Sequence, residues 1–180
     1  MKIVDIFAQQ LCSVAYKKKG ADEYDICEYD RLLDLWTDVS YLYQYAKTNN
    51  IKEINKFVKA RLKDAEKIEN FLDELIEEKI SLDAYFHQLD NQETGYKLLS
   101  LRKGKTSNKD GLRFYAIKID DDCFLITGGA IKMSLKNDDH KDTREEMKKI
   151  DKVKSFLKEN GVIDYDSFYE FRIENESNDK

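Results

Sequence analysis

The side chains best suited to chemistry in this sequence are four basic groups and one tyrosine between residues 96 and 136. They are Arg102, Arg113, Tyr115, Lys132 and Lys136. An arginine fork binds two phosphate oxygens at once, and a lysine supplies a compact positive charge. These residue types are compatible with a phosphate-binding face.

The charge of the chain is distributed unevenly. The formal net charge of −5 argues against a protein that binds nucleic acid through overall basicity. Residues 96–118 nevertheless carry seven basic side chains against one acid, Asp110. The basic side chains are Lys97, Arg102, Lys103, Lys105, Lys109, Arg113 and Lys118. This pattern is compatible with a localised phosphate-binding face, although residues 103–109 taken alone are better explained by a solvated basic loop.

No enzyme motif of high specificity accompanies these side chains. The sequence has no phosphate loop, zinc helix, nucleophile elbow or Rossmann glycine pattern, and the pair Gly128-Gly129 indicates a bulge where a strand ends. The three cysteines are scattered, which predicts reduced thiols, and the two histidines, His87 and His140, lie far apart. We therefore expect no cofactor and no metal.

Three short apolar runs bounded by turn residues predict an antiparallel meander within residues 96–136. The runs cover residues 96–101, 112–119 and 123–127. Alternation along the middle run places Leu112, Phe114 and Ala116 on one face of the sheet. Arg113 and Tyr115 then share the opposite face with Ile117.

The segments around the meander have helical periodicity. Apolar residues spaced by three and four predict two long amphipathic helices, a hairpin over residues 25–78, with Trp36 on the buried stripe. The pairs Asp25/Glu28 and Thr143/Glu146 match N-terminal capping patterns. The second pair opens C-terminal helices over residues 143–172, and residues 1–20 hold a candidate edge strand. The predicted fold is one α+β domain, residues 1–180, in which an N-terminal helical hairpin packs on a small antiparallel sheet.

Hydropathy predicts the compartment. No apolar run approaches the roughly 18 to 20 residues that span a bilayer. The N-terminus, MKIVDIFAQQ, has an acid within its apolar part and lacks the layout of a signal peptide. We expect a cytoplasmic protein without a membrane partner.

Four consecutive segments resemble the RelE/ParE superfamily of toxins, and most of all its HigB-like branch. The segments read LLSLRKG, GLRFYAIKI, CFLITGGAIKMSLK and DTREEMKKIDKVKSFLKENG. The resemblance covers about a third of the chain, residues 96–157, and equates the helical hairpin with the helix pair before the sheet in that fold. This chain departs from the family in its acidity and in having Lys132-Met133 where the family has a double lysine.

The resemblance implies metal-free cleavage of messenger RNA, often at the ribosome, by a toxin that a separate antitoxin protein neutralises. Arg113 would clamp the phosphate, with Arg102 as the next candidate. Lys132 and Lys136 would stabilise charge or transfer a proton, and Tyr115 would orient the RNA.

Two other functions remain open from the sequence. The first is a catalytically inactive binding or regulatory module on the same fold, favoured by the acidity and the incomplete lysine pair. The second is a structural protein, in which Arg113 forms an ion pair with Asp120, Asp121 or Asp122. A reading frame for a small helix-turn-helix protein beside the gene would favour the toxin.

Overall fold

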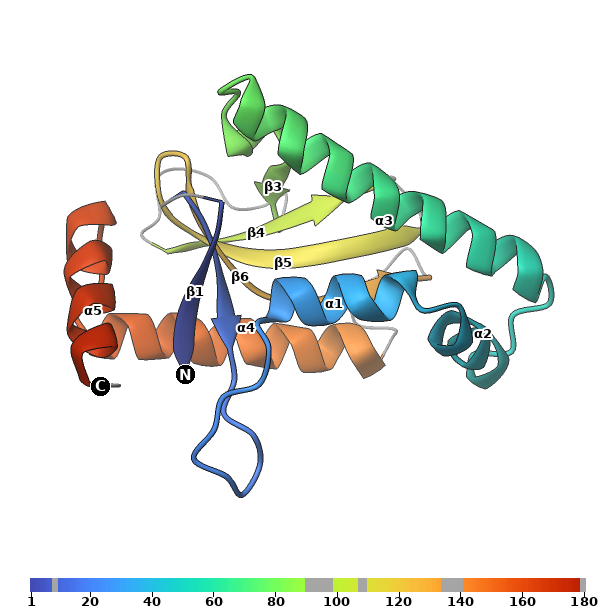
Figure 1. Ribbon diagram of the computed structural model, residues 1–180, viewed down its shortest axis with the longest axis horizontal. Coiled ribbons are helices and arrows are strands. Elements are labelled where there is room, and N and C mark those ends of the chain that lie inside the picture. Colours follow the sequence, from blue (N-terminus) through green and yellow to red (C-terminus); the bar gives the residue numbers. More distant parts are fainter. Residues whose placement is uncertain (8–9, 90–98, 107–109, 134–140, 179–180) are drawn as a thin grey trace.

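The computed structural model describes residues 1–7, 10–89, 99–106, 110–133 and 141–178. One mixed sheet has the strand order β1-β2-β6-β5-β4-β3, and five α-helices surround it (Figure 1). The strands are β1 (Lys2–Phe7), β2 (Leu11–Ala15), β3 (Phe86–Gln88), β4 (Ser100–Lys105), β5 (Gly111–Asp120) and β6 (Cys123–Lys132). The helices are α1 (Glu28–Thr37), α2 (Val39–Thr48), α3 (Ile54–Glu77), α4 (Lys141–Glu159) and α5 (Tyr165–Asn178), with a 3-10 turn η1 (Leu82–Ala84). The predicted α+β class is confirmed.

The predicted arrangement, an N-terminal helical hairpin on a small antiparallel sheet, is wrong. Strands β1 and β2 come first and pair as an antiparallel hairpin. Strand β2 then pairs in parallel with β6, so the sheet is mixed and has six strands. The candidate edge strand within residues 1–20 is thus two strands, of which β1 forms the edge. All five residues of β2 are buried, which an interior strand allows and an edge strand does not favour.

The helical hairpin is also wrong in its number of helices, because its first stripe breaks at Asp38. The carboxylate of Asp38 accepts hydrogen bonds from the backbone N–H groups of Ser40 and Tyr41, which ends α1 and caps α2. Helix α1 begins at Glu28 itself, after Cys27, so the Asp25 cap is not formed. Helix α4 likewise begins at Lys141, before Thr143.

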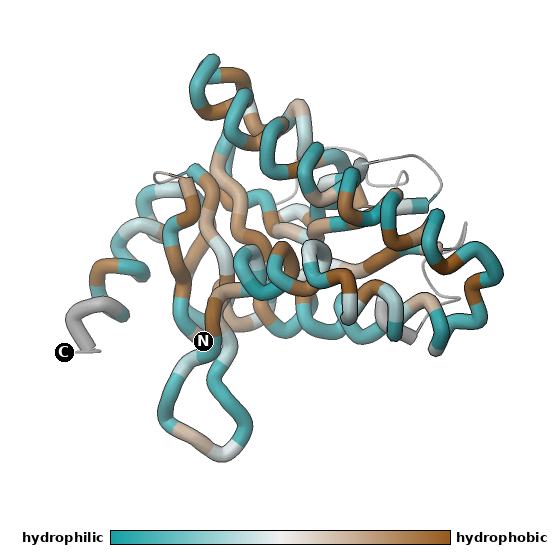
Figure 2. Tube along the Cα trace, turned by 45° about the vertical axis from the view of Figure 1, so that its right-hand side comes forward, coloured by the Kyte–Doolittle hydropathy of each residue, from teal (hydrophilic) through white to brown (hydrophobic). Residues whose placement is uncertain are grey.

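Two hydrophobic cores lie on opposite faces of the sheet. Helices α1, α2 and α3 cover one face, where Trp36 is 1% exposed and its ring centroid lies 4.9 Å from that of Phe114. Helices α4 and α5 cover the other face, which we call the α4 face. Hydrophobic and hydrophilic residues alternate along the long helix α3 (Figure 2), and its buried residues include Val58, Ala65, Ile68, Leu72 and Leu75. The prediction that Trp36 is buried is confirmed.

The predicted pairing of the three meander strands is confirmed, but the predicted ends of the strands are wrong. Strands β4, β5 and β6 are adjacent and antiparallel, and Leu112, Phe114 and Ala116 face α1–α3 as predicted. The strand before residue 102 was expected to end there, but β4 continues to Lys105. Strand β6 was expected to end at Gly128-Gly129, but it runs on to Lys132, with its irregularity at the step between Tyr115 and Ala116 of β5. Residues 96–98 lie outside the described residues.

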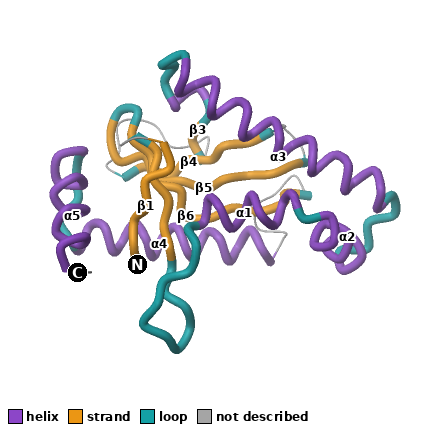
Figure 3. The backbone as a smooth tube through the Cα atoms, viewed as in Figure 1, coloured by secondary structure: helices purple, strands orange, loops and turns teal. Residues whose placement is uncertain are grey.

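The parallel pair β2/β6 is short, and its two strands continue to opposite faces of the sheet. Only Leu11–Ser13 pair with Phe124–Ile126. Strand β2 leads through a long loop, drawn in teal in Figure 3, to α1 on one face. Strand β6 leads to α4 on the other face. No helix among the described residues is long and apolar enough to cross a membrane.

Candidate functional site

Four basic side chains gather at one end of the sheet on three adjacent strands. We call Lys103, Lys105, Arg113 and Lys132 the basic cluster. Lys105 is the direct cross-strand partner of Arg113, and Lys132 of Gly111, so β4, β5 and β6 each contribute to the same face. Direct cross-strand partners have Cβ atoms about 5 Å apart, and like charges there are destabilising.

The pKa of Lys132 reflects the proximity of these positive charges. Its pKa is lowered, first by burial and then by the positive charges of Arg113, Lys103 and Lys105. Burial also lowers the pKa of Arg113, against which the charge of Asp110 acts in the opposite direction. The cluster therefore carries concentrated positive charge in partly desolvated surroundings, where a bound anion would interact strongly.

The predicted site residues are only partly brought together. Arg113, Tyr115 and Lys132 lie on the α4 face. Arg102 pairs with Ala116 and so lies on the opposite face, with its Nε and Nη1 atoms buried and lacking hydrogen-bond partners. The sheet separates it from Arg113. Lys136 lies outside the described residues.

Arg113 and Tyr115 of β5 are buried, contrary to the expectation that they are accessible. Arg113 is 3% exposed and Tyr115 is fully buried, whereas a phosphate clamp on an open sheet was expected to be accessible. The structural alternative is not supported either. Asp120 closes the opposite end of β5, and at about 3.3 Å per residue the strand keeps Asp120–Asp122 far from Arg113.

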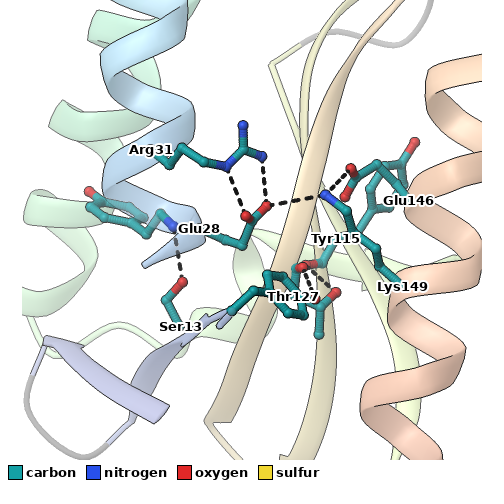
Figure 4. A network of polar contacts seen from close by, with 9 residues as sticks. Ser13, Glu28, Arg31, Tyr115, Thr127, Glu146 and Lys149 are labelled. Carbon is teal, nitrogen blue, oxygen red and sulfur yellow. Dashed lines mark hydrogen bonds and ion pairs between the residues drawn. The ribbon is translucent and has the colours of Figure 1, made fainter. Parts of the chain in front are cut away.

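A second polar group fills the place where β2 and β6 diverge. We call Glu28, Arg31, Glu146 and Lys149 the carboxylate network (Figure 4). Arg31 donates through Nε and Nη2 to the two oxygens of Glu28, at 2.8 and 2.7 Å. The Nζ atom of Lys149 lies 2.7 Å from Glu146 Oε1 and 3.7 Å from Glu28 Oε2. One ammonium thus joins a carboxylate of α1 to a carboxylate of α4.

The network lies just beyond the paired residues of β2 and β6, where the two strands diverge. The Tyr16 hydroxyl spans the divergence by donating to the Thr127 carbonyl at 2.7 Å. The Lys149 Nζ atom lies 5.7 Å from the centre of the Tyr16 ring. Tyr16 thus connects the network to the point where the strands diverge.

Glu146 is the member of the network with unused hydrogen-bonding capacity. It is 7% exposed, and its Oε2 atom has no hydrogen-bond partner. Burial raises its pKa, the Lys149 hydrogen bond and charge lower it, and the charge of Glu28 raises it. The carboxyl group fits because position 128 is glycine: a Cβ there would come far too close to Oε2. The pKa of the Glu146 carboxyl group is therefore raised above its ordinary value, chiefly because the group is buried.

Tyr115 lies between the basic cluster and the carboxylate network. The pKa of its hydroxyl is raised chiefly by burial, lowered by the charge of Arg113 and raised again by that of Glu146. Glu146 packs over Gly128, the cross-strand partner of Tyr115. The α4 face thus presents cations, a phenol and a carboxyl group in sequence. These groups are of the types that metal-free phosphodiester cleavage uses.

Both carboxylates of the network match helix-capping patterns in the sequence, and for this reason the network was not predicted. Glu28 and Glu146 were each taken as the last residue of a capping pattern, whereas both are buried within helices. A signal was present: each glutamate has a basic residue three positions later, Arg31 or Lys149, on the same helix face.

The remaining chemistry-bearing groups do not form a further centre. Cys12, Cys27 and Cys123 are buried and none of them is in a disulfide, and His140 lies outside the described residues. In the part of the chain that the structure describes, no three His, Cys, Asp or Glu side chains are grouped so that they could hold a metal ion. Comparison of the chain with protein-family models, with curated proteins and with solved structures gives no match.

Proposed function

We propose that this protein binds RNA at the basic cluster and cleaves it without a metal ion, as a toxin of the RelE/HigB type that an antitoxin partner neutralises. The observation that carries the proposal is the convergence of four basic side chains from three adjacent strands. Like charges held together weaken folding, and a polyanion bound there would remove that cost. The resemblance of residues 96–157 to those toxins supplies the reaction.

The reaction requires three kinds of group. The RNA 2′-hydroxyl oxygen attacks the adjacent phosphorus, the P–O5′ bond breaks, and a 2′,3′-cyclic phosphate and a 5′-hydroxyl form. One group accepts the proton of the 2′-hydroxyl, and another supplies a proton to the leaving oxygen. Arg113 and Lys132 would stabilise the charge on phosphorus. Glu146 and Tyr115, which lie on the same side of the sheet as Arg113, would carry out the proton transfers.

A second candidate function is RNA binding without cleavage. The burial of Arg113 and Tyr115 favours it, because a group at 3% exposure or less meets a scissile phosphate only if the covering elements move. Lys103, Lys105 and Lys132 are half-buried and so more accessible to a backbone than Arg113, and Lys103 Nζ already donates to the Leu89 carbonyl at 2.8 Å.

Binding is tested by titrating a labelled single-stranded RNA at several salt concentrations. Each phosphate contact contributes about −0.7 to the slope of log affinity against log salt for a single strand. Lys132→Ala should therefore make the slope shallower by about 0.7. Lys158→Ala removes an exposed lysine at the other end of α4 and should leave the slope unchanged.

Cleavage is tested with the same RNA in excess EDTA. Loss of a cation that stabilises the transition state costs on the order of 100-fold or more in rate, so Arg113→Ala should nearly abolish cleavage. Expressed without an antitoxin, the wild type should slow growth, and Arg113→Ala at equal abundance should not. Binding without cleavage by the folded wild type would establish the second candidate. Absence of binding would refute both.

A further inference from the structure

A cavity of about 410 Å³ opens beside the basic cluster, between α3 and the β3–β4 edge of the sheet. Its floor is apolar and aromatic, formed by Ile68, Phe71 and Tyr85. Its rim carries three nitrogen groups, on Lys67, His87 and Lys105. We propose that this cavity binds one nucleobase of a single-stranded RNA whose backbone lies on the basic cluster, an inference that rests on the proposed function.

The floor is a fixed aromatic surface with one ring accessible. Tyr85 is 4% exposed and lies flat over Gly104, where a Cβ would come far too close to the ring. Phe71 contacts it with ring centroids 5.8 Å apart at 57°, yet remains 37% exposed. Tyr85 thus holds Phe71 from beneath and leaves one side of the ring for a ligand. Every base has a π-face that can stack on such a ring, whatever the sequence.

The rim joins the cavity to the basic cluster. Lys105 belongs to both: it lines the cavity, and its charge lowers the pKa of Lys132. His87 on β3 is the cross-strand partner of Lys103, another cluster member. The cluster lies on the α4 face and the cavity floor on the face that α3 covers, so the bound strand crosses the β3–β4 edge at Lys105, where its base enters the cavity.

The size and charge of the cavity favour a nucleobase over a protein segment. Its volume lies in the range of small-molecule sites, whereas a docked helix needs an elongated groove for several anchoring side chains. Lys67 and Lys105 attract the phosphate of the nucleotide, and Phe71 supplies the stacking surface. Binding of a base through stacking and of its phosphate through lysine is how proteins hold single strands without reading their sequence.

The test uses an RNA octamer and a series in which each base in turn is removed, leaving the backbone intact. In the wild type, removal of the base that occupies the cavity should weaken binding by about 5- to 150-fold, the range for one stacked base. Phe71→Ala should weaken binding of the intact RNA by the same factor. The affinity of this variant should then no longer change when that base is removed. Phe71→Tyr should retain the wild-type pattern.

Two controls separate stacking from charge. Tyr43→Ala removes an aromatic side chain of matched exposure, 38%, on α2 and should change nothing. Phe71→Ala should leave the salt slope unchanged, whereas Lys67→Gln should make it shallower by about 0.7. If Phe71 had only a structural role, Phe71→Ala would change both the RNA affinity and the salt slope.

The outcomes distinguish this inference from the proposed function. If Lys132→Ala weakens RNA binding but no base removal matters to the wild type, the base site is refuted and the basic cluster stands. If RNA does not bind at all, the proposed function fails. Titration with adenosine and uridine 5′-monophosphates then tests separately whether the cavity binds a nucleobase. Binding by the wild type that is lost in Phe71→Ala supports the base site. No binding to the wild type at millimolar concentration refutes it. Equal loss for Phe71→Ala with every member of the base-removal series would also refute it.

Discussion

Replacing Gly128 by alanine should destabilise the protein by displacing one buried carboxylate. The new Cβ would lie 3.0 Å from Glu146 Cδ and closer still to Oε2, so the carboxyl group must move. Movement breaks the 2.7 Å hydrogen bond from Lys149. A hydrogen bond to a charged group contributes about 1.5 to 3 kcal/mol, so the free energy of unfolding should fall by about that amount.

The same substitution should cost little when Glu146 is already alanine. The backbone of Gly128 does not have a positive φ, so alanine is compatible with it and restricts the unfolded chain. In the Glu146→Ala background, Gly128→Ala should therefore be neutral or stabilising by up to about 1 kcal/mol. Urea denaturation followed by the fluorescence of Trp36, the single tryptophan, measures all four members of the cycle.

Gly129→Ala provides the matched control. Its Cβ would lie 2.5 Å from the backbone oxygen of Arg113 and 2.8 Å from Leu32 Cδ1, neither of which Glu146→Ala relieves. It should destabilise equally in both backgrounds, by about 1 to 3 kcal/mol or more. Equal costs of Gly128→Ala with and without Glu146 would show that the carboxylate does not lie over Gly128.

Two further predictions concern the core and the titration of the network. Trp36→Ala should lower the free energy of unfolding by about 3 to 5 kcal/mol, since the side chain is 1% exposed; an unchanged midpoint in thermal circular dichroism would contradict its place in the core. Because burial raises the pKa of Glu146, the native state keeps this proton to higher pH than the unfolded state. Its contribution is therefore present below the ordinary glutamate pKa of about 4.3 and is lost as pH rises through the raised pKa. The stability of the wild type relative to Glu146→Gln should accordingly fall over that window, and a difference that rises with pH would mean that Lys149 dominates.

Periodicity in the sequence was sufficient to predict the class of the fold and the faces of its central strand. The alternation of residues 112–117 placed Phe114 and Tyr115 on opposite faces of the sheet, as the structure has them, although Tyr115 was expected on an open polar face and lies in the second core. The helical spacing of residues 54–77 likewise predicted α3 and its buried stripe. Both signals are local, because a pattern of period 2 or 3.6 records which face of a single element is buried.

Periodic patterns of this kind could not predict short elements or helix breaks. Strand β3 has three residues, too few for alternation to show. The break at Asp38 leaves the apolar spacing across it unchanged, so only the capping hydrogen bonds reveal two helices. Gly128-Gly129 indicated the end of a strand, yet pairing with β5 carries β6 through it.

Only the tertiary structure decided how the chemistry-bearing groups meet. Strand pairing is a choice between distant segments, and the parallel contact of β2 with β6 has no local signature. That contact sends the chain to opposite faces and brings Glu28, near the start of the chain, to the same ammonium as Glu146. Tertiary packing also buries Arg113, which alternation alone had assigned to an open surface. Residue types and spacing predicted cations on that face, and packing between distant segments determined their exposure.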